Sequence, residues 1–206
     1  VPLEIGHAIR MVGDEERNFS VSLFPDGNVL FAGTMNEDES TMSLSDKVLD
    51  RATVLRFGKP SKMVASQPAM EKIREGDPLG FDTWQSWLEE KDVCQEAKEA
   101  IESLGGIMAS AGSPFGHRVT QSMTSYVANY PDSTAGGQCL AVVDQVEQKI
   151  LPKLRGREIP SIEGQLNELK KMVDRLGDSE LAEEIGKGAG SSEGTFHWAG
   201  LDREEE

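Results

Sequence analysis

The segment NVLFAGTMNEDES, residues 28–40, decides the predicted fold of this chain. Its apolar run, Val29–Ala32, has the length and composition of a buried central β-strand. Gly33-Thr-Met-Asn36 follows, so a polar amide comes at the carboxyl end of the predicted strand, just before the acidic residues 37–39. In open α/β sheets, ligands bind at this edge. An Asn side chain there can hydrogen-bond a water molecule or a phosphate oxygen without carrying charge.

A second β-type run follows a short distance along the chain. The stretch Leu44-Ser-Asp-Lys-Val-Leu-Asp-Arg51 indicates a short helix that ends in an arginine, and Thr53–Phe57 has the composition of another strand. We predict that residues 28–34 and 53–57 are neighbouring strands of one sheet. The order of strand, polar tip, short helix, arginine and strand is typical of the second half of a nucleotide-binding domain.

These residues resemble the AAA+ NTPases, and within them the branch that contains the GTP-dependent motor subunit of methylcytosine-specific restriction systems. That branch carries a strand ending in Gly-Thr-Met-Asn, an acidic loop, a Leu-x-Asp-x-x-Leu helix and an arginine, all present within residues 28–58. A weaker similarity to the helical lid covers residues 115–156. The implied fold class is an α/β remnant followed by an all-α part, that is, the C-terminal strands of an AAA+ nucleotide-binding sheet and a helical lid domain.

The resemblance implies three site residues. Asn36 matches the first-sensor Asn, which orients the attacking water at the γ-phosphate; the alternative is an Asn that caps a strand-to-helix loop. Arg51 matches an arginine finger that acts in the nucleotide site of the neighbouring subunit, and its alternative is an ion pair with Asp50 or Asp46. Arg118 matches the second sensor, at the start of a lid helix, with a solvent-exposed arginine as the alternative.

The chain departs from the family's pattern near two of these residues. The family often has a run of arginines at the finger, whereas this chain has only Asp50-Arg51-Ala52, in which the Asp can orient or mute the guanidinium. The acidic stretch Glu37–Glu39 stands where family members often carry an arginine. Lys153 and Arg155 are further candidates for contacts between subunits.

The catalytic core of such an NTPase is missing from this sequence. No Gly-x-x-x-x-Gly-Lys-Ser/Thr motif occurs, so no phosphate-binding loop is predicted, and no strand ending in Asp-Glu precedes Asn36. The glycine-rich stretch Gly186–Ser192 has the wrong spacing and indicates a flexible linker. In the family both missing elements lie upstream, so the resemblance implies the C-terminal part of a longer enzyme. We expect ATP or GTP with Mg²⁺ in the full-length parent, and neither cofactor nor hydrolysis in this chain alone.

Composition bounds the remaining classes of function. The chain has 206 residues, a formal net charge of −15 and an apolar fraction of 37%. Phosphate backbones are bound by clustered Lys and Arg, so we expect nucleic acid to bind only through parts outside this chain. Cysteines and histidines have no metal-ligand spacing, and no metal site is predicted. No signal peptide or long apolar run occurs, so we expect a cytoplasmic protein without membrane contact.

The chain divides into four predicted parts. The first contains a β-hairpin over residues 1–27, the sensor strand and the arginine-finger helix. The second is a connector, the third a helical lid domain, and the fourth a flexible acidic tail in which Phe196 and Trp198 can anchor a short patch. The four parts are residues 1–60, 61–91, 92–186 and 187–206.

Helical periodicity begins near residue 92. Three helices are predicted over residues 92–156, the first of them ending at Gly105-Gly106, and further helix is predicted over residues 160–186. In the connector, four apolar side chains share one helical face, which predicts a face buried on the lid or, alternatively, a docking site. These are Phe81, Trp84, Trp87 and Leu88.

Three hypotheses on function follow. The first is the C-terminal part of a ring-forming AAA+ NTPase, the motor of a nucleic-acid defence or remodelling system, whose partners are like subunits in a ring and a nuclease or effector subunit. The second is a non-catalytic lid-and-sensor module that binds proteins. The third is a helical interaction protein unrelated to AAA+ NTPases, which a central Asn36 strand in a parallel sheet would exclude.

Overall fold

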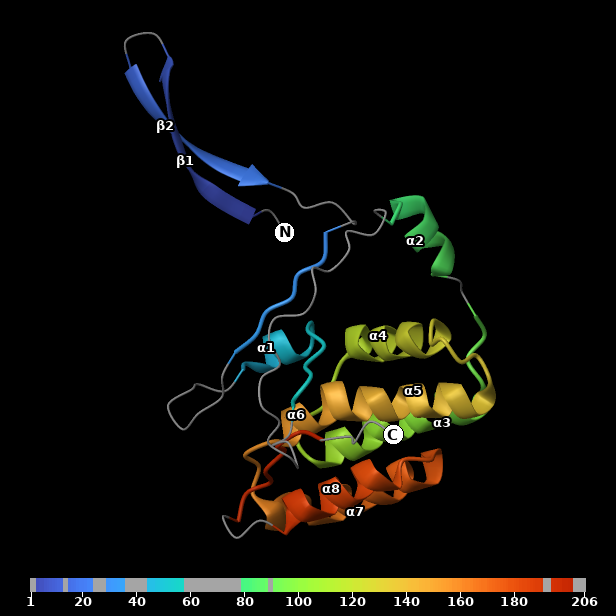
Figure 1. The fold of residues 1–206 in the computed structure, drawn as a ribbon. Coiled ribbons are helices and arrows are strands. Elements are labelled where there is room, and N and C mark those ends of the chain that lie inside the picture. Colours follow the sequence, from blue (N-terminus) through green and yellow to red (C-terminus); the bar gives the residue numbers. More distant parts are fainter. Residues whose placement is uncertain are drawn as a thin grey trace, which may run out of the picture. The chain divides into compact units, whose positions relative to one another are not determined.

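The computed structural model describes most of the chain, in seven stretches of sequence. They are residues 3–12, 15–23, 29–35, 44–57, 79–88, 91–190 and 194–201. Two compact units contain these stretches, Val1–Met42 and Ser43–Glu206, and each is described by itself. Figure 1 shows the labelled helices and strands in chain order.

The first unit contains an antiparallel β-hairpin (Figure 1). Its strands are β1, Leu3–Val12, and β2, Glu15–Leu23. They pair from Leu3 opposite Leu23 to Val12 opposite Glu15, with one irregularity in register near the start of β1. The hairpin lies within the range for which the alternating pattern of the sequence predicts one.

The predicted AAA+ sheet is absent from the described residues, so the predicted fold class is wrong. Residues 29–35 form no strand and all are exposed; Phe31, at the centre of the predicted buried run, is 71% exposed. Within 53–57, only Phe57 makes a β-bridge, and its partner is Leu201. A β-forming run becomes a central strand only where neighbouring strands satisfy its backbone N–H and C=O groups. The described residues supply no such neighbours.

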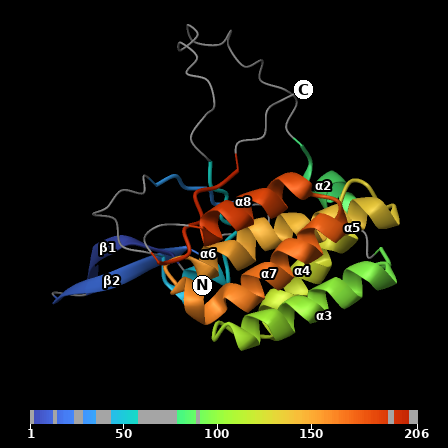
Figure 2. The same cartoon turned by 90° about the horizontal axis from the view of Figure 1, so that it is seen from below.

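The second unit is helical. The short helices α1, Asp46–Leu49, and α2, Phe81–Trp87, precede the others. The helical bundle that follows consists of α3, Gln95–Ser110; α4, His117–Ala128; α5, Ala135–Gln145; the π-helical turn η1, Val146–Ile150; α6, Leu151–Leu154; α7, Ile159–Leu176; and α8, Ser179–Ala189. Helix α5 contacts α3, α4 and α7, and α7 packs along α8 (Figure 2).

Apolar residues at three- and four-residue spacing explain why the bundle forms. In α3, Ala97, Ala100, Ile101 and Leu104 are at most 4% exposed. Helix α5 has buried residues around more of its circumference, including the consecutive residues 141–143, as its place among three neighbouring helices requires. The bundle therefore has one continuous apolar core.

Helix α3 does not end at Gly105-Gly106, so that predicted helix end is wrong. It continues to Ser110. The next turn buries Ile107 and Met108, at 7% and 0% exposure. Burial of two such side chains outweighs the cost of glycine in a helix, which is about 1 kcal/mol per residue.

Two distinct helices occupy the C-terminal part of the bundle. Gly177, with a φ of +110°, ends α7 in the left-handed conformation that glycine adopts without strain. The side chain of Asp178 then accepts a hydrogen bond from the Leu181 N–H, 2.8 Å away, and caps α8. Helix α8 extends to Ala189. The linker predicted from Gly186 is therefore wrong for the residues that lie inside this helix.

Residues 194–201 pack on the bundle, which corrects the predicted flexible tail. Phe196 and Trp198, the two aromatic residues that the sequence singles out, are 1% and 2% exposed. The backbone N–H of Phe196 donates to the carbonyl oxygen of Arg157 at 2.8 Å, and its carbonyl oxygen accepts from Gly156 at 2.9 Å. Aromatic burial and backbone hydrogen bonds together hold this segment against the bundle.

Candidate functional site

Two of the three predicted site residues lie within the described part of the chain. Asn36 lies outside it, so its role as a sensor stays a prediction. Arg118 is the second residue of α4 and is exposed. Its side chain makes no hydrogen bond or ion pair with another described residue. A cation at a helix N-terminus interacts unfavourably with the helix macrodipole. The stability of α4 therefore does not explain why an arginine occurs at position 118.

Arg51 lies in a tight turn at the end of α1, which we call the Arg51 turn, residues 50–52. The backbone N–H groups of Arg51 and Ala52 both donate to the carbonyl oxygen of Val48, at 3.0 and 2.9 Å. Leu49 is the buried side chain of α1, at 7% exposure. Helix α1 contacts α6 of the bundle (Figure 1), so the Arg51 turn belongs to the helical unit.

Two buried lysines hold the residues on either side of Arg51. Lys153, on α6, forms an ion pair with the carboxylate of Asp50. Lys149, on η1, donates a hydrogen bond to the carbonyl oxygen of Ala52, 3.2 Å away. We call Lys149 and Lys153 the lysine pair; they are 4% and 8% exposed. Arg51 itself is exposed and has no ion-pair partner among the described residues.

The lysine pair brings two positive charges to this turn. Two ammonium groups act on one carboxylate, that of Asp50, whose side chain is 37% exposed. Burial lowers the pKa of Lys149; the charge of Asp50 opposes this shift, and the charge of Lys153 adds to it. An ammonium group held away from water is unfavourable unless it is paired, and the only hydrogen-bond partner described for Lys149 is a neutral carbonyl.

The ion pairs of the described residues bear on two of the predictions for these charged residues. An ion pair of Arg51 with Asp50 or Asp46 does not occur among the described residues, because Asp50 pairs with Lys153. The role of Arg51 as a finger stays a prediction. The prediction that Lys153 contacts a neighbouring subunit is wrong, since its ammonium group is buried inside this chain.

Lys149 is the residue of this site that the sequence analysis missed. The signal that could have found it is helical spacing. Lys149 and Lys153 each come three residues after a buried apolar residue, Val146 and Ile150, so both fall on the apolar face of the predicted helix. An ammonium group on such a face is rarely buried without a specific partner.

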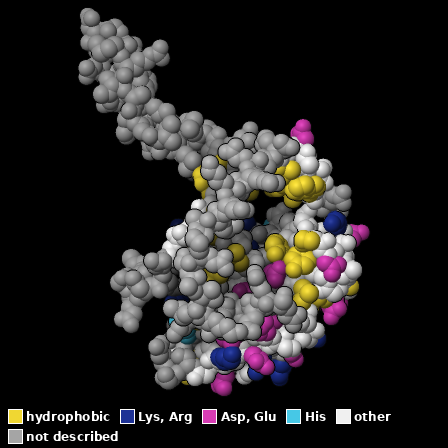
Figure 3. Space-filling view, in the orientation of Figure 1, with side chains coloured by type: hydrophobic (Ala, Val, Ile, Leu, Met, Phe, Trp, Pro, Cys, Tyr) yellow, Lys and Arg dark blue, Asp and Glu magenta, His cyan; other side chains and the backbone are white. Residues whose placement is uncertain are grey.

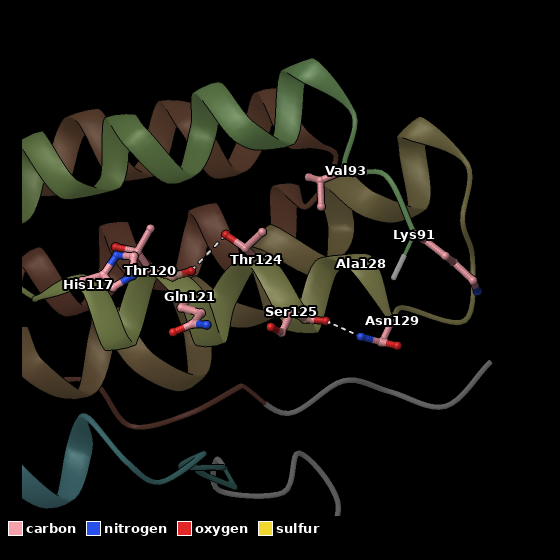
Figure 4. A pocket seen from close by; sticks show the side chains of 9 residues that line it. All are labelled: Lys91, Val93, His117, Thr120, Gln121, Thr124, Ser125, Ala128 and Asn129. Carbon is pink, nitrogen blue, oxygen red and sulfur yellow. Dashed lines mark hydrogen bonds between the residues drawn. The ribbon is translucent and has the colours of Figure 1, made fainter. Parts of the chain in front are cut away.

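A second candidate site is an open groove along α4, with a volume of about 410 Å³. Polar side chains of α4, among them His117 and Gln121, line it, with Lys91 at one end (Figure 4). Several polar groups bond within their own helix: the Thr124 hydroxyl donates to a carbonyl at 3.0 Å and the Asn129 amide to another at 2.8 Å. The groove gathers no set of charges that defines a class of ligand.

The exposed face of α2 contradicts the predicted burial of its aromatic residues on the lid. Phe81, Trp87 and Leu88 are 39%, 60% and 52% exposed. Phe81 and Trp84 stack on each other, with ring centroids 6.0 Å apart. The alternative, a docking site, stays a prediction.

The surface charges and the titratable groups of the described residues limit the kinds of site that these residues can form. Acidic and basic side chains are interspersed over the helical region on the face shown in Figure 3. Across the seven described stretches, no three His, Cys, Asp or Glu side chains are grouped so as to hold a metal ion. No described helix combines the length and the apolar character of a membrane span.

The chain belongs to a family described as a domain of unknown function, DUF8727, which matches residues 73–187, more than half of the sequence. This range contains both members of the lysine pair, whereas the Arg51 turn precedes it. No curated protein and no solved structure matches the chain significantly. None of these comparisons links the chain to AAA+ NTPases, so that resemblance stays a prediction.

Proposed function

We propose that this chain is the C-terminal portion of a ring-forming AAA+ NTPase motor, in which Arg51 serves the nucleotide site of the neighbouring subunit. Hydrolysis of ATP or GTP in the parent enzyme is coupled to remodelling or to nucleic-acid translocation. The partners of this motor are like subunits in a cytoplasmic ring and a nuclease or effector subunit.

One observation carries the proposal: Arg51 is exposed while the residues on both sides of it are held by buried lysines. A finger needs a fixed backbone, because positioning a charged group in advance lowers the entropy lost when it meets its target. The carboxylate nearest in sequence, Asp50, is engaged by Lys153. No described carboxylate neutralises the guanidinium of Arg51, and in the proposal its charge acts on an anionic group of the neighbouring subunit.

The sequence lacks the motifs of a complete nucleotide site. The sequence contains no Gly-x-x-x-x-Gly-Lys-Ser/Thr motif, and the described residues hold no cluster of carboxylates for Mg²⁺. The proposal requires that these elements come from sequence outside the chain. Under this proposal, Arg118 contacts the nucleotide from the start of α4, and Asn36 orients the attacking water. The isolated chain should show no turnover of ATP or GTP.

The test uses the natural polypeptide that contains this chain. Arg51→Ala should leave nucleotide affinity nearly unchanged and reduce turnover at least about 10³-fold, because a finger acts on charge that develops in the transition state. Lys47→Ala, which removes another exposed cation close to the turn, is the matched control and should keep full turnover. Unchanged turnover in Arg51→Ala would overturn the proposal.

Mixed rings separate a residue that acts in the neighbouring site from one that acts in its own. A subunit lacking Arg51 should regain turnover at its own site when its neighbour supplies the arginine. A subunit with Asn36→Ala should not be rescued, because the sensor acts within its own subunit. Identical behaviour of the two variants in mixed rings would show that Arg51 does not act in trans.

The second candidate function is a non-catalytic module that binds a protein partner. The exposed aromatic face of α2 favours it, since Trp87 is 60% exposed and aromatic side chains are enriched at the centres of protein interfaces. Under this hypothesis, Trp87→Ser abolishes association with an effector subunit, whereas Arg51→Ala changes no activity of the parent polypeptide. Under the first hypothesis, Arg51→Ala abolishes turnover.

A further inference from the structure

We propose that Lys149 and Lys153 are positioning residues for Arg51, through which the helical bundle sets and regulates the direction of the arginine. The inference rests on the proposed function, because it takes Arg51 to act on a neighbouring site. It goes beyond that function in assigning the control of Arg51 to two residues of the bundle. A displacement of η1 or α6 would then move the Arg51 turn as well.

The lysine pair contacts two different kinds of atom. Lys153 pairs with the side chain of Asp50, and Lys149 donates to the main-chain carbonyl of Ala52. The residue before Arg51 and the residue after it are therefore both fixed to the bundle. Helix α1 has only four residues and is too short to be stable alone. The bundle, rather than α1, therefore determines where the Cα–Cβ bond of Arg51 points.

The π-helical turn explains how both ammonium groups come to lie at this turn. In η1 the helix widens over Val146–Ile150, and Pro152 follows as the second residue of α6. Proline has no N–H, and in an α-helix its ring clashes with the carbonyl four residues earlier. A wider turn relieves this clash and changes the direction of the side chains that follow. The result here is that Lys149 and Lys153 both lie inward, against the Arg51 turn.

Stability alone gives no reason for a lysine at position 149. Burial removes the hydration of the ammonium group, and its hydrogen bond is to a neutral carbonyl. Replacement of a buried charge by an apolar residue of similar size is often neutral or stabilising. Lys149 makes a directed bond beside Arg51, and we attribute its presence to the geometry that this bond imposes.

Lys153 has an electrostatic task as well. Its ammonium group forms an ion pair with the carboxylate of Asp50, the residue directly before Arg51 in the sequence. Without Lys153, this carboxylate is free to pair with the guanidinium and to neutralise it. This electrostatic role can be distinguished from packing by a double variant. If Lys153 acts by pairing with Asp50, removal of the Asp50 charge should compensate for the loss of Lys153.

The first test needs no nucleotide and uses the chain itself. Trypsin cleaves after Arg51 when the Arg51 turn leaves the bundle, and cleavage after Arg175, inside α7, reports unfolding of the bundle. Lys149→Met should speed cleavage after Arg51 about tenfold, as local opening becomes easier, with cleavage after Arg175 and the Tm unchanged. Lys187→Met, at an exposed site on α8, is the matched control. Unchanged cleavage after Arg51, or general unfolding of the Lys149 variant, would overturn the inference.

The second test measures turnover in the natural polypeptide. Lys149→Met and Lys153→Met should lower kcat with KM nearly unchanged, and Lys153→Arg should keep most of the turnover. Adding Asp50→Asn to Lys153→Met should restore part of the lost kcat, whereas a purely structural role predicts no rescue. Loss of turnover in Arg51→Ala but in neither lysine variant would overturn this inference alone. Full turnover in Arg51→Ala would overturn the proposed function itself.

Discussion

The side-chain amide of Gln138 on α5 joins two backbone groups at the entrance to α3. Its Oε1 accepts a hydrogen bond from the backbone N–H of Cys94, 2.6 Å away, and its Nε2 donates to the carbonyl oxygen of Asp92 at 2.9 Å. Gln138 is only 3% exposed. One buried amide thus satisfies two backbone groups that would otherwise lack partners, and it connects α3 to the central helix of the bundle.

Loss of this amide should destabilise the bundle. Gln138→Leu should lower the free energy of unfolding by about 1–3 kcal/mol, because the backbone groups of Cys94 and Asp92 are left unsatisfied. Urea denaturation followed by circular dichroism measures the change. Gln121→Leu, at an exposed position of α4, is the control and should shift it by no more than about 0.5 kcal/mol. A wild-type midpoint for Gln138→Leu would refute this role of the amide.

A pair of glycine substitutions should have opposite effects. A Cβ at Gly188 would lie 2.5 Å from the carbonyl oxygen of His197 and 2.9 Å from the Phe196 ring, so Gly188→Ala should lower the free energy of unfolding by about 1–3 kcal/mol. A Cβ at Gly164 in α7 has no atom within 4 Å, and Gly164→Ala should raise it by about 0.5–1 kcal/mol. Equal effects in thermal denaturation would contradict the close packing of α8 on the C-terminal segment.

Phe196 should contribute far more to stability than a phenylalanine elsewhere in the same unit. It is 1% exposed, whereas Phe57 is 89% exposed. Phe196→Ala should lower the free energy of unfolding by about 3–5 kcal/mol, and Phe57→Ala by no more than about 0.5 kcal/mol. Guanidinium denaturation of both variants measures the difference. Similar midpoints would mean that residues 194–201 do not belong to the core.

The two cysteines should differ in reactivity. Burial, together with the negative charge of Glu96, raises the pKa of Cys139 to about 11, so its reactive thiolate is scarce at pH 8. Cys94 is partly exposed. A disulfide reagent that labels thiols should therefore modify one cysteine in the folded protein and two in urea. Rapid labelling of both in the folded state would contradict the burial of Cys139.

The same shift predicts how stability depends on pH. The folded-state pKa of Cys139 lies above its usual value of 9.0, so the folded state retains this proton more strongly. The stabilisation is present below pH 9 and is lost as the pH rises from 9.0 to about 11. Burial and the hydrogen bond to Asp144 raise the pKa of Tyr126 to about 12, which extends the loss to higher pH. Cys139→Ala should flatten the pH dependence between 9.0 and about 11.

Helix positions could be predicted because their periodicity is local. Helix α4 starts directly after Gly116, and α7 carries its predicted apolar stripe from Ile162 to Leu176. Helix ends were less predictable where tertiary burial competes with local preference, as at Gly105-Gly106. Of the candidate site, Arg51 and Lys153 could be singled out from the sequence. The contact of the lysine pair with the Arg51 turn could not be predicted, because nothing local links either lysine to that turn.

By itself, the sequence determined the helical character of the bundle and marked Arg51, Phe196 and Trp198 as residues of interest. Helical periodicity arises between residues three or four positions apart, so it is visible in any short window of sequence. Only the tertiary structure decided that residues 29–35 form no strand, since a strand exists only with partners from elsewhere in the chain. It also decided which charges meet: Lys149 and Lys153 reach the Arg51 turn because folding places α6 beside α1, and pairing between distant residues leaves no local signal.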